Sequence, residues 1–98
     1  MARTPEGAVK DKVKKVLATM GAYYVMPVTG GFGNSGIPDI LCCYKGRFIG
    51  IECKANGGKP TRLQLSHLDE IEHNGGLSFI VDEHNVNILR QLITDAVK

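Results

Sequence analysis

Residues 36–54 have the sequence GIPDILCCYKGRFIGIECK and contain the clearest structural pattern in the chain. The runs 38–44 and 47–53 are rich in apolar and aromatic side chains, which favour strands. Between them stands Lys45-Gly46, whose glycine tolerates the positive φ angle that a tight turn requires. The stretch therefore predicts an antiparallel β-hairpin.

The register of this hairpin brings charged side chains together. With the turn centred on Lys45-Gly46, the numbers of opposed residues have a constant sum, so Asp39 faces Glu52. Side chains alternate along a strand, and Lys54 therefore shares the face of Glu52. Two opposed carboxylates destabilise a hairpin unless a cation lies between them. Since oxygen ligands with open water positions suit Mg²⁺ or Mn²⁺ better than zinc, the arrangement predicts a divalent metal site.

A purely structural interpretation of the same residues is an ion pair between Glu52 and Lys54, with Asp39 at the end of its strand. Pro-Asp and Glu-x-Lys are each common sequences. Their combination in register, beside the glycine-rich residues 29–36 (TGGFGNSG), favours the metal site. Such a loop could let the backbone of a substrate approach closely.

Periodicity and capping signals organise the rest of the chain. Thr4 and Thr61 are expected to cap helices, and Gly21 and Asn74 follow the last apolar positions of those helices. We expect helices over 4–21, 61–74 and 86–97, and strands over 22–28, 38–44, 47–53 and 77–81. This order predicts an α/β fold in a single domain, residues 1–98, with a mixed four-stranded sheet flanked by helices.

Composition narrows the class of protein. The 98 residues are 43% hydrophobic and 22% charged, with a formal net charge of +2, as in an ordinary globular domain. Basic residues concentrate near the N-terminus, whereas residues 69–83 are mostly acidic. Three cysteines without metal-ligand spacing predict reduced, buried thiols. With no membrane-spanning run and no signal peptide, we expect a cytoplasmic protein of a bacterial or phage-infected host cell.

The residues Gly36-Ile37-Pro38-Asp39, a hairpin, and Ile51-Glu52-Cys53-Lys54 resemble the PD-(D/E)xK nuclease signature. More closely, the chain resembles a stand-alone, phage-type member of the virus-type replication-repair nuclease (VRR-NUC) family. The resemblance extends over nearly the whole chain, and it implies a restriction-endonuclease-like αβββαβ core with an extra C-terminal helix. It also implies metal-dependent cleavage of DNA phosphodiester bonds and a homodimer related to Holliday-junction resolvases.

The resemblance assigns roles to individual residues. Asp39 and Glu52 would bind Mg²⁺ or Mn²⁺ together with the backbone carbonyl of Cys53, and Glu6 would contact the metal directly or through water. Lys54 would orient or help deprotonate the attacking water and offset charge in the transition state. Gln64 would position water or phosphate.

DNA contacts are expected at the start of the second helix, where backbone N–H groups can receive a phosphate, in the N-terminal basic group and in the glycine-rich loop. The residues are Lys10, Lys14, Phe32, Lys59, Thr61 and Arg62. Phe32 could stack on a base or wedge a junction, and a plain hairpin tip explains its loop equally well.

A homodimeric, structure-selective DNA endonuclease, such as a junction resolvase, is the activity we expect from these features. Since one small domain holds one active centre, cutting two strands would require a two-fold dimer. A flap or general endonuclease is an alternative within the same class. A non-catalytic DNA-structure-binding module and a metal-stabilised protein-interaction domain are alternatives from other classes.

Overall fold

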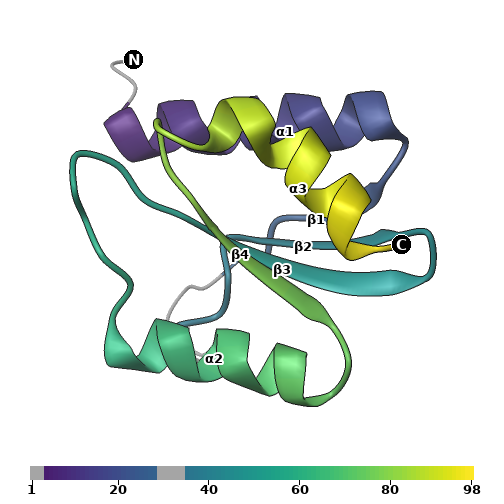
Figure 1. Cartoon of the computed structure of the whole chain (residues 1–98). Helices are drawn as coiled ribbons and strands as arrows, with labels where there is room; N and C mark the ends of the chain where they lie inside the picture. Colours follow the sequence, from purple (N-terminus) through teal and green to yellow (C-terminus); the bar gives the residue numbers. More distant parts are fainter. Residues whose placement is uncertain (1–3, 29–34) are drawn as a thin grey trace.

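The computed structural model describes residues 4–28 and 35–98. Its elements are α1 (Pro5–Met20), β1 (Tyr23–Val25), β2 (Ile40–Tyr44), β3 (Arg47–Cys53), α2 (Arg62–His73), β4 (Leu77–Val81), η1 (Val86–Ile88) and α3 (Leu89–Ala96), shown in Figure 1. The predicted order of helices and strands is confirmed.

Helix α1 begins and ends where its sequence predicts. The Thr4 hydroxyl oxygen accepts a hydrogen bond from the Gly7 N–H at 2.9 Å, and Pro5 occupies the first helical position. Gly21 ends the helix with a φ of 77°, a conformation that glycine adopts without steric cost. The buried face of α1 consists of Val9, Val13 and Leu17.

The hairpin between β2 and β3 has the predicted register. Lys45 and Gly46 have φ angles of 53° and 80°, which match a two-residue turn with positive φ at both positions. Beyond this turn Tyr44 pairs with Arg47, and the ladder continues to the pair of Ile40 with Ile51. One further step along the register places Asp39 opposite Glu52.

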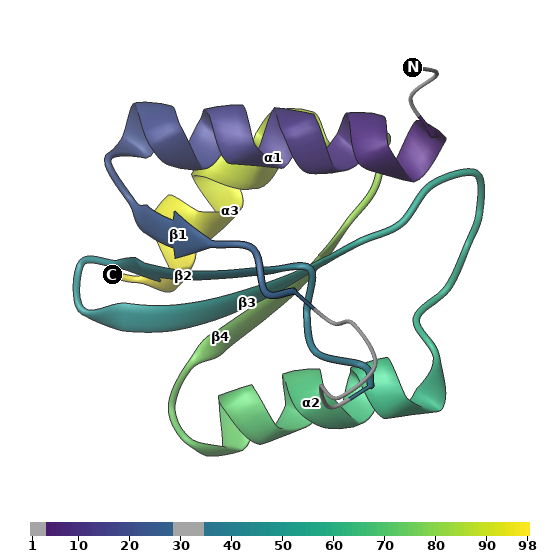
Figure 2. The same ribbon diagram turned by 180° about the vertical axis from the view of Figure 1, so that it is seen from behind.

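The four strands form one mixed sheet in the order β1-β2-β3-β4, as predicted. The pairs β1–β2 and β2–β3 are antiparallel, whereas β3 and β4 are parallel because α2 connects them as a crossover. Figures 1 and 2 show α1 and α3 on one face of this sheet and α2 on the other. The first turns of α1 and α2 lie at the same end of the sheet.

Two predicted strands are shorter in the structure. The strand expected over 22–28 comprises only Tyr23–Val25, at an edge of the sheet, and Pro27 lies just beyond it. The strand expected to begin at Pro38 begins at Ile40, so Asp39 lies outside the ladder. Pro38 has no N–H to donate to the ladder. The Cys53 N–H donates to the Asp39 side chain in place of a backbone carbonyl.

The predicted final helix starts with the short 3₁₀ turn Val86–Ile88 before α3. Among the described residues, no helix is long and apolar enough to cross a membrane.

The main core lies between the sheet and the α1–α3 layer. It contains Val9, Val13, Leu17, Ile40, Cys42, Ile49, Ile51, Cys53, Val81, Val86, Leu89 and Ile93. The apolar residues Ile40, Leu41, Ile49 and Ile51 predict strands that are covered on both faces. This prediction is wrong for part of the α2 face, where Phe48 is 49% exposed. Leu63 and Leu65, two of the apolar positions that indicate the second helix in the sequence, are exposed as well. Cys43, predicted to be buried, is also exposed because it points to this face of the sheet.

Candidate active site

The predicted catalytic side chains gather at one end of the sheet. Asp39 precedes β2, Glu52 is the penultimate residue of β3 and Lys54 follows β3 directly. This is the end at which α1 and α2 begin (Figure 1). The hairpin and the two helix starts therefore bring residues from distant parts of the sequence to one place.

Asp39 is fixed by contacts on both of its carboxylate oxygens. One oxygen accepts a hydrogen bond from the Cys53 N–H at 2.8 Å. The other lies 3.6 Å from the Lys10 ammonium nitrogen. Because the N–H and C=O of a strand residue point toward the same neighbouring strand, the Cys53 carbonyl is expected on the Asp39 side too. The Lys54 N–H donates to the Val81 carbonyl on the opposite side.

Glu52 is the single buried charged side chain of the described core, with 1% exposure. One carboxylate oxygen lies 3.7 Å from the Lys54 ammonium nitrogen. The other, Oε1, is buried and has no hydrogen-bond partner among the described residues. A buried carboxylate oxygen without a partner costs free energy, so this position calls for a bound cation, a proton or water.

The pKa of the Glu52 carboxyl is raised from 4.5 to about 7, mainly by burial. The neighbouring Asp39 carboxylate contributes the next largest part of this rise, and the charge of Glu6 a smaller part. The Lys54 ammonium lowers the pKa of Glu52 but does not cancel the other effects. The carboxylates of Glu6, Asp39 and Glu52 therefore carry more negative charge than the ammonium groups of Lys10 and Lys54 compensate.

Lys54 is held between the sheet and a tight turn. Its side chain is only 14% exposed. The turn that follows is closed by a hydrogen bond from the Gly58 N–H to the Ala55 carbonyl at 2.9 Å. Glu83, after β4, anchors this turn by accepting from the Asn56 N–H at 2.9 Å. Sequence reasoning missed Glu83, because no local spacing signals a contact between segments 27 residues apart.

Lys10 belongs to this centre, although its sequence position suggested only a contact with the DNA backbone. It lies on α1 and pairs with Asp39, as described above. Glu6 lies one helical turn before it, and its charge reaches Glu52 and Cys53. The four-residue spacing of Glu6 and Lys10 puts them on one helix face, a signal that the sequence already contained.

The donor set fits a hard divalent cation. Asp39 and Glu52 offer carboxylate oxygens, and the buried Glu52 Oε1 has no other partner among the described residues. No group of three or more His, Cys, Asp or Glu side chains that could hold a metal occurs within residues 4–28 and 35–98. The ion would therefore complete its shell with the Cys53 carbonyl and water, a shell that Mg²⁺ tolerates and that structural zinc does not.

A cavity of about 360 Å³ opens beside Asp39 and is lined by Lys10 and Gln64. Its wall includes Gly36, whose φ of 84° and close packing leave no room for a side chain. A Cβ atom there would lie 2.9 Å from the backbone of Leu63 in α2. The loop before Asp39 thus packs directly on the first turn of α2 and shapes the cavity.

Gln64 has a local role in α2. Its side-chain oxygen accepts from the Thr61 N–H at 2.8 Å, and its own N–H donates to the Thr61 hydroxyl at 3.1 Å. This reciprocal pair is a capping box. Since the oxygen is occupied, a contact between Gln64 and a substrate would have to use its amide NH₂ group. The predicted role of Gln64 in positioning water or phosphate stays a prediction.

The predicted DNA-contacting residues lie in separate places. Lys59 and Arg62 are exposed around the capped start of α2. Lys14 lies further along α1, 3.5 Å from Asp11, and lines a separate hollow with Lys15 and others. Phe32 lies outside the described residues.

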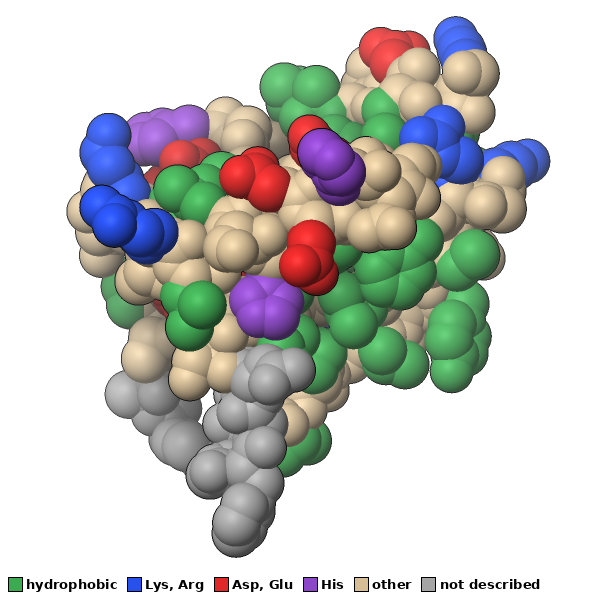
Figure 3. Space-filling model, turned by 90° about the horizontal axis from the view of Figure 1, so that it is seen from below, with side chains coloured by type: hydrophobic (Ala, Val, Ile, Leu, Met, Phe, Trp, Pro, Cys, Tyr) green, Lys and Arg blue, Asp and Glu red, His purple; other side chains and the backbone are tan. Residues whose placement is uncertain are grey.

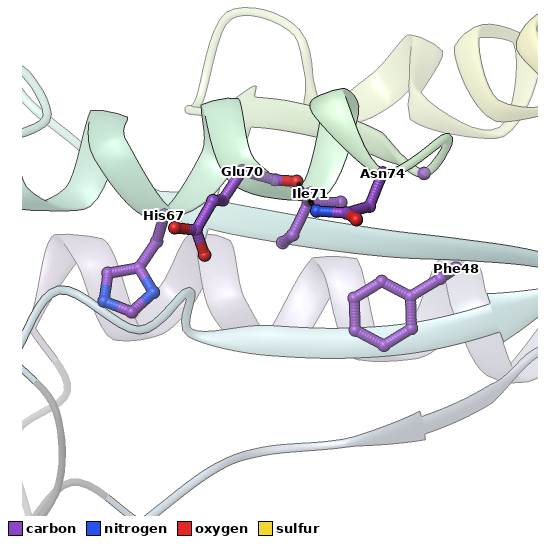
Figure 4. Close-up of a pocket in the computed structure, with 6 residues that line it drawn as sticks. Phe48, His67, Glu70, Ile71 and Asn74 are labelled. Carbon is purple, nitrogen blue, oxygen red and sulfur yellow. Dashed lines mark hydrogen bonds between the residues drawn. The ribbon is translucent and has the colours of Figure 1, made fainter.

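A second hollow, of about 280 Å³, lies between α2 and β3. Figure 4 shows His67, Glu70 and Ile71 of α2 on one side and the ring of Phe48 on the other. His67 contacts the Ser35 carbonyl at 3.1 Å through Nε2, so it ties α2 to the loop before β2. This hollow is distinct from the carboxylate pair, and we assign no chemistry to it.

Comparisons with known proteins agree with this architecture. No protein-family model matches the sequence, and no curated protein matches it. A solved structure described as "VRR_NUC domain" superposes on the chain with a TM-score of 0.72 and 24% sequence identity. The match covers 90% of this chain and 96% of that one. The chain therefore has the fold of a VRR_NUC domain.

Proposed function

We propose that the chain is a Mg²⁺- or Mn²⁺-dependent nuclease that hydrolyses DNA phosphodiester bonds. The observation that carries this proposal is the buried Glu52 oxygen, which has no partner among the described residues and belongs to a carboxylate whose nearest negative neighbour is Asp39. The likeness to a VRR_NUC domain structure supports it independently. A protein that only binds DNA gains nothing from carboxylates that face phosphate groups.

Asp39, Glu52 and the Cys53 carbonyl would hold the divalent ion. When bound, the ion supplies Lewis acidity toward the phosphodiester and lowers the pKa of water at the site. Asp39 is held for this role by the Cys53 N–H, so its geometry does not depend on the ligand. A carboxylate pair would favour hard metals over zinc.

Lys54 would act on the attacking water and on the phosphate. Its ammonium group lies beside Glu52 and is poised to orient water and stabilise the added negative charge of the transition state. In the hydrolysis, water forms a new P–O bond, one ester P–O bond breaks, and the leaving oxygen takes up a proton. Gln64 would help to position water or phosphate from the wall of the cavity.

The test is a cleavage assay on labelled four-way junction, flap, duplex and single-stranded DNA, with Mg²⁺, Mn²⁺ or EDTA. Asp39→Asn and Lys54→Met should each lower the cleavage rate by at least about 100-fold, because each removes a group that acts on the transition state. Lys98→Met is the matched control, since Lys98 is exposed at the C-terminal end and lies 3.8 Å from exposed Asp95.

Cleavage that persists in EDTA or in Asp39→Asn would exclude the proposed mechanism. Tight DNA binding by the wild-type chain without cleavage in any metal would instead identify a binding module. A four-way junction cut in preference to duplex DNA would support junction resolution, which we propose as the activity. A preference for flaps would replace that part of the proposal.

We also propose that the active form is a homodimer, which would present two centres to two strands. An apolar hollow of about 290 Å³ on the α2 side of the sheet supports a self-association surface. It is lined by Tyr23, Val25, Leu41, Cys42, Cys43 and Phe48. Figure 3 shows hydrophobic side chains gathered beside the charged surface of α2. Exposed apolar patches of this kind mark interaction sites.

Sedimentation equilibrium tests the dimer. Phe48→Lys should convert a dimer to a monomer, because a charge on each copy would be buried without a partner. Ile88→Lys is the matched control, since Ile88 is comparably exposed, at 54%, but lies in η1. A wild-type chain that sediments as a monomer at all accessible concentrations would exclude the dimer.

A further inference from the structure

We propose that Lys10 is an active-site residue that exchanges partners: it neutralises Asp39 when the metal is absent and binds the scissile phosphate when the metal is present. This inference rests on the proposed nuclease function and deepens it. It assigns to Lys10 a role beyond a contact with the DNA backbone away from the centre.

The first support is the position of the Lys10 ammonium group. It lies 3.6 Å from the Asp39 oxygen that does not accept from Cys53. That oxygen is the one left to bind a cation. Lys10 and a divalent ion therefore compete for the same carboxylate oxygen.

The second support is the cavity. Lys10, Asp39 and Gln64 line the same space of about 360 Å³, so Lys10 borders the cavity next to the carboxylate that would hold the metal. The Lys10 side chain is 29% exposed and carries a flexible four-carbon stem. It can leave Asp39 without any movement of the α1 backbone.

The third support is the charge of the centre. Glu6, Asp39 and Glu52 carry three formal negative charges, and Lys10 and Lys54 carry two positive ones. A divalent ion would turn this excess of one negative charge into an excess of one positive charge, which matches one phosphodiester anion. Lys10 is then the cation that the metal releases for the substrate.

The matched pair of variants is Lys10→Met and Lys12→Met. Methionine retains an apolar stem of similar length and removes the charge. Lys12 lies on the same helix and is exposed, so its replacement removes the same charge from α1 without touching the centre. Both variants should keep the circular dichroism spectrum and the melting temperature of the wild-type chain.

Metal binding, measured by isothermal titration calorimetry with Mn²⁺ and no DNA, is the first arm. Loss of the competing ammonium should tighten Mn²⁺ binding by Lys10→Met about two- to fivefold. Removal of a merely structural lysine would leave the affinity unchanged or weaken it. Lys12→Met should match the wild-type chain.

DNA binding, measured by fluorescence anisotropy, is the second arm. In Ca²⁺, which takes similar oxygen ligands, Lys10→Met should bind DNA at least about fivefold more weakly than Lys12→Met. In EDTA the DNA affinities of the two variants should agree within about twofold, because without a metal Lys10 would pair with Asp39 and would not bind DNA. In Mn²⁺ the cleavage rate of Lys10→Met at saturating DNA should fall about tenfold or more.

Unchanged or weaker Mn²⁺ binding by Lys10→Met would overturn the inference. A DNA-binding defect of equal size in Ca²⁺ and EDTA would also overturn it, since that result describes an ordinary backbone contact. If the wild-type chain cuts no DNA although both binding arms behave as expected, the nuclease proposal fails and the exchange by Lys10 stands.

Discussion

One face of the sheet is sealed by α1 and α3, whereas α2 covers the opposite face only in part (Figures 1 and 2). The sealed face presents Ile40, Ile49 and Ile51, all with no exposure. On the open face Gly50 lets α2 approach, because a Cβ atom there would lie 2.5 Å from the Ile71 side chain. The same face leaves Phe48 half exposed.

The two faces of the sheet therefore have different roles, one in stability and the other in the candidate site. The sealed face supplies the apolar burial that folds a small domain. The face shared by Gly50 and Glu52 instead carries the buried carboxylate, the cavity beside Asp39 and the apolar hollow. Side-chain alternation along β3 makes both possible, because Ile51 and Glu52 are neighbours in sequence and point to opposite sides.

The largest expected effect on stability comes from truncating the sealed face. Ile51→Ala should lower the free energy of unfolding by about 2–5 kcal/mol, since it removes a fully buried side chain and leaves a cavity. Phe48→Ala, on the open face of the same strand, should cost about 1 kcal/mol or less in the monomer. Urea denaturation with unchanged m-values measures both. Equal costs would refute the division between the faces.

A smaller effect is expected from the charge on Glu52. The folded-state pKa of about 7 exceeds the ordinary value of 4.5, so folding favours the protonated form. The contribution of Glu52 to the free energy of unfolding is present in full below pH 4.5 and is lost as the pH rises through about 7. The total loss amounts to about 3 kcal/mol. In EDTA, the wild-type chain should therefore lose stability across this range relative to Glu52→Gln, as measured by melting curves at each pH.

The outcome that contradicts this prediction is a constant difference in stability between the two chains from pH 4.5 to 8. Mn²⁺ should restore stability to the wild-type chain at pH 8 and should stabilise Glu52→Gln clearly less at the same concentration. Asp69→Asn is a control, because Asp69 is an exposed carboxylate on α2.

The smallest effect is expected from the helix caps. Thr61→Ala and Thr4→Ala remove the same chemical group from α2 and α1, and each should cost about 1 kcal/mol. Their local consequences should differ, because α2 buries little beyond Leu68. Hydrogen exchange should show lost protection along α2 in Thr61→Ala and little change along α1 in Thr4→Ala. Equal local losses would show that α2 is anchored as firmly as α1.

The sequence predicted the hairpin and its register because local chemistry determines both. Lys45-Gly46 selects a two-residue turn, and the turn then sets the opposed pairs as far as Ile40 and Ile51. One further step along the same register brings Asp39 and Glu52 together. The caps Thr4 and Thr61 were predictable for the same reason. These features depend on residues close in sequence.

The rest of the site depends on contacts between distant segments. The Lys10–Asp39 pair joins α1 to the hairpin, and the Glu83–Asn56 bond joins the ends of β4 and β3. Neither contact follows from spacing along the chain. The sequence alone does predict that Glu6 and Lys10 lie on one face of their helix. The exposure of Leu63 and Leu65 escaped prediction because apolar periodicity does not reveal how much of a helix its sheet covers.

Titration of Mn²⁺ into the metal-free chain by calorimetry, beside Asp39→Asn and Glu52→Gln, tests whether the opposed carboxylates form a metal site. Asp95→Asn, which changes an exposed carboxylate near the end of α3, is the control. We predict saturable binding by the wild-type chain and by Asp95→Asn, and affinities at least about tenfold weaker in the other two variants. Undiminished Mn²⁺ binding by both Asp39→Asn and Glu52→Gln would contradict the account.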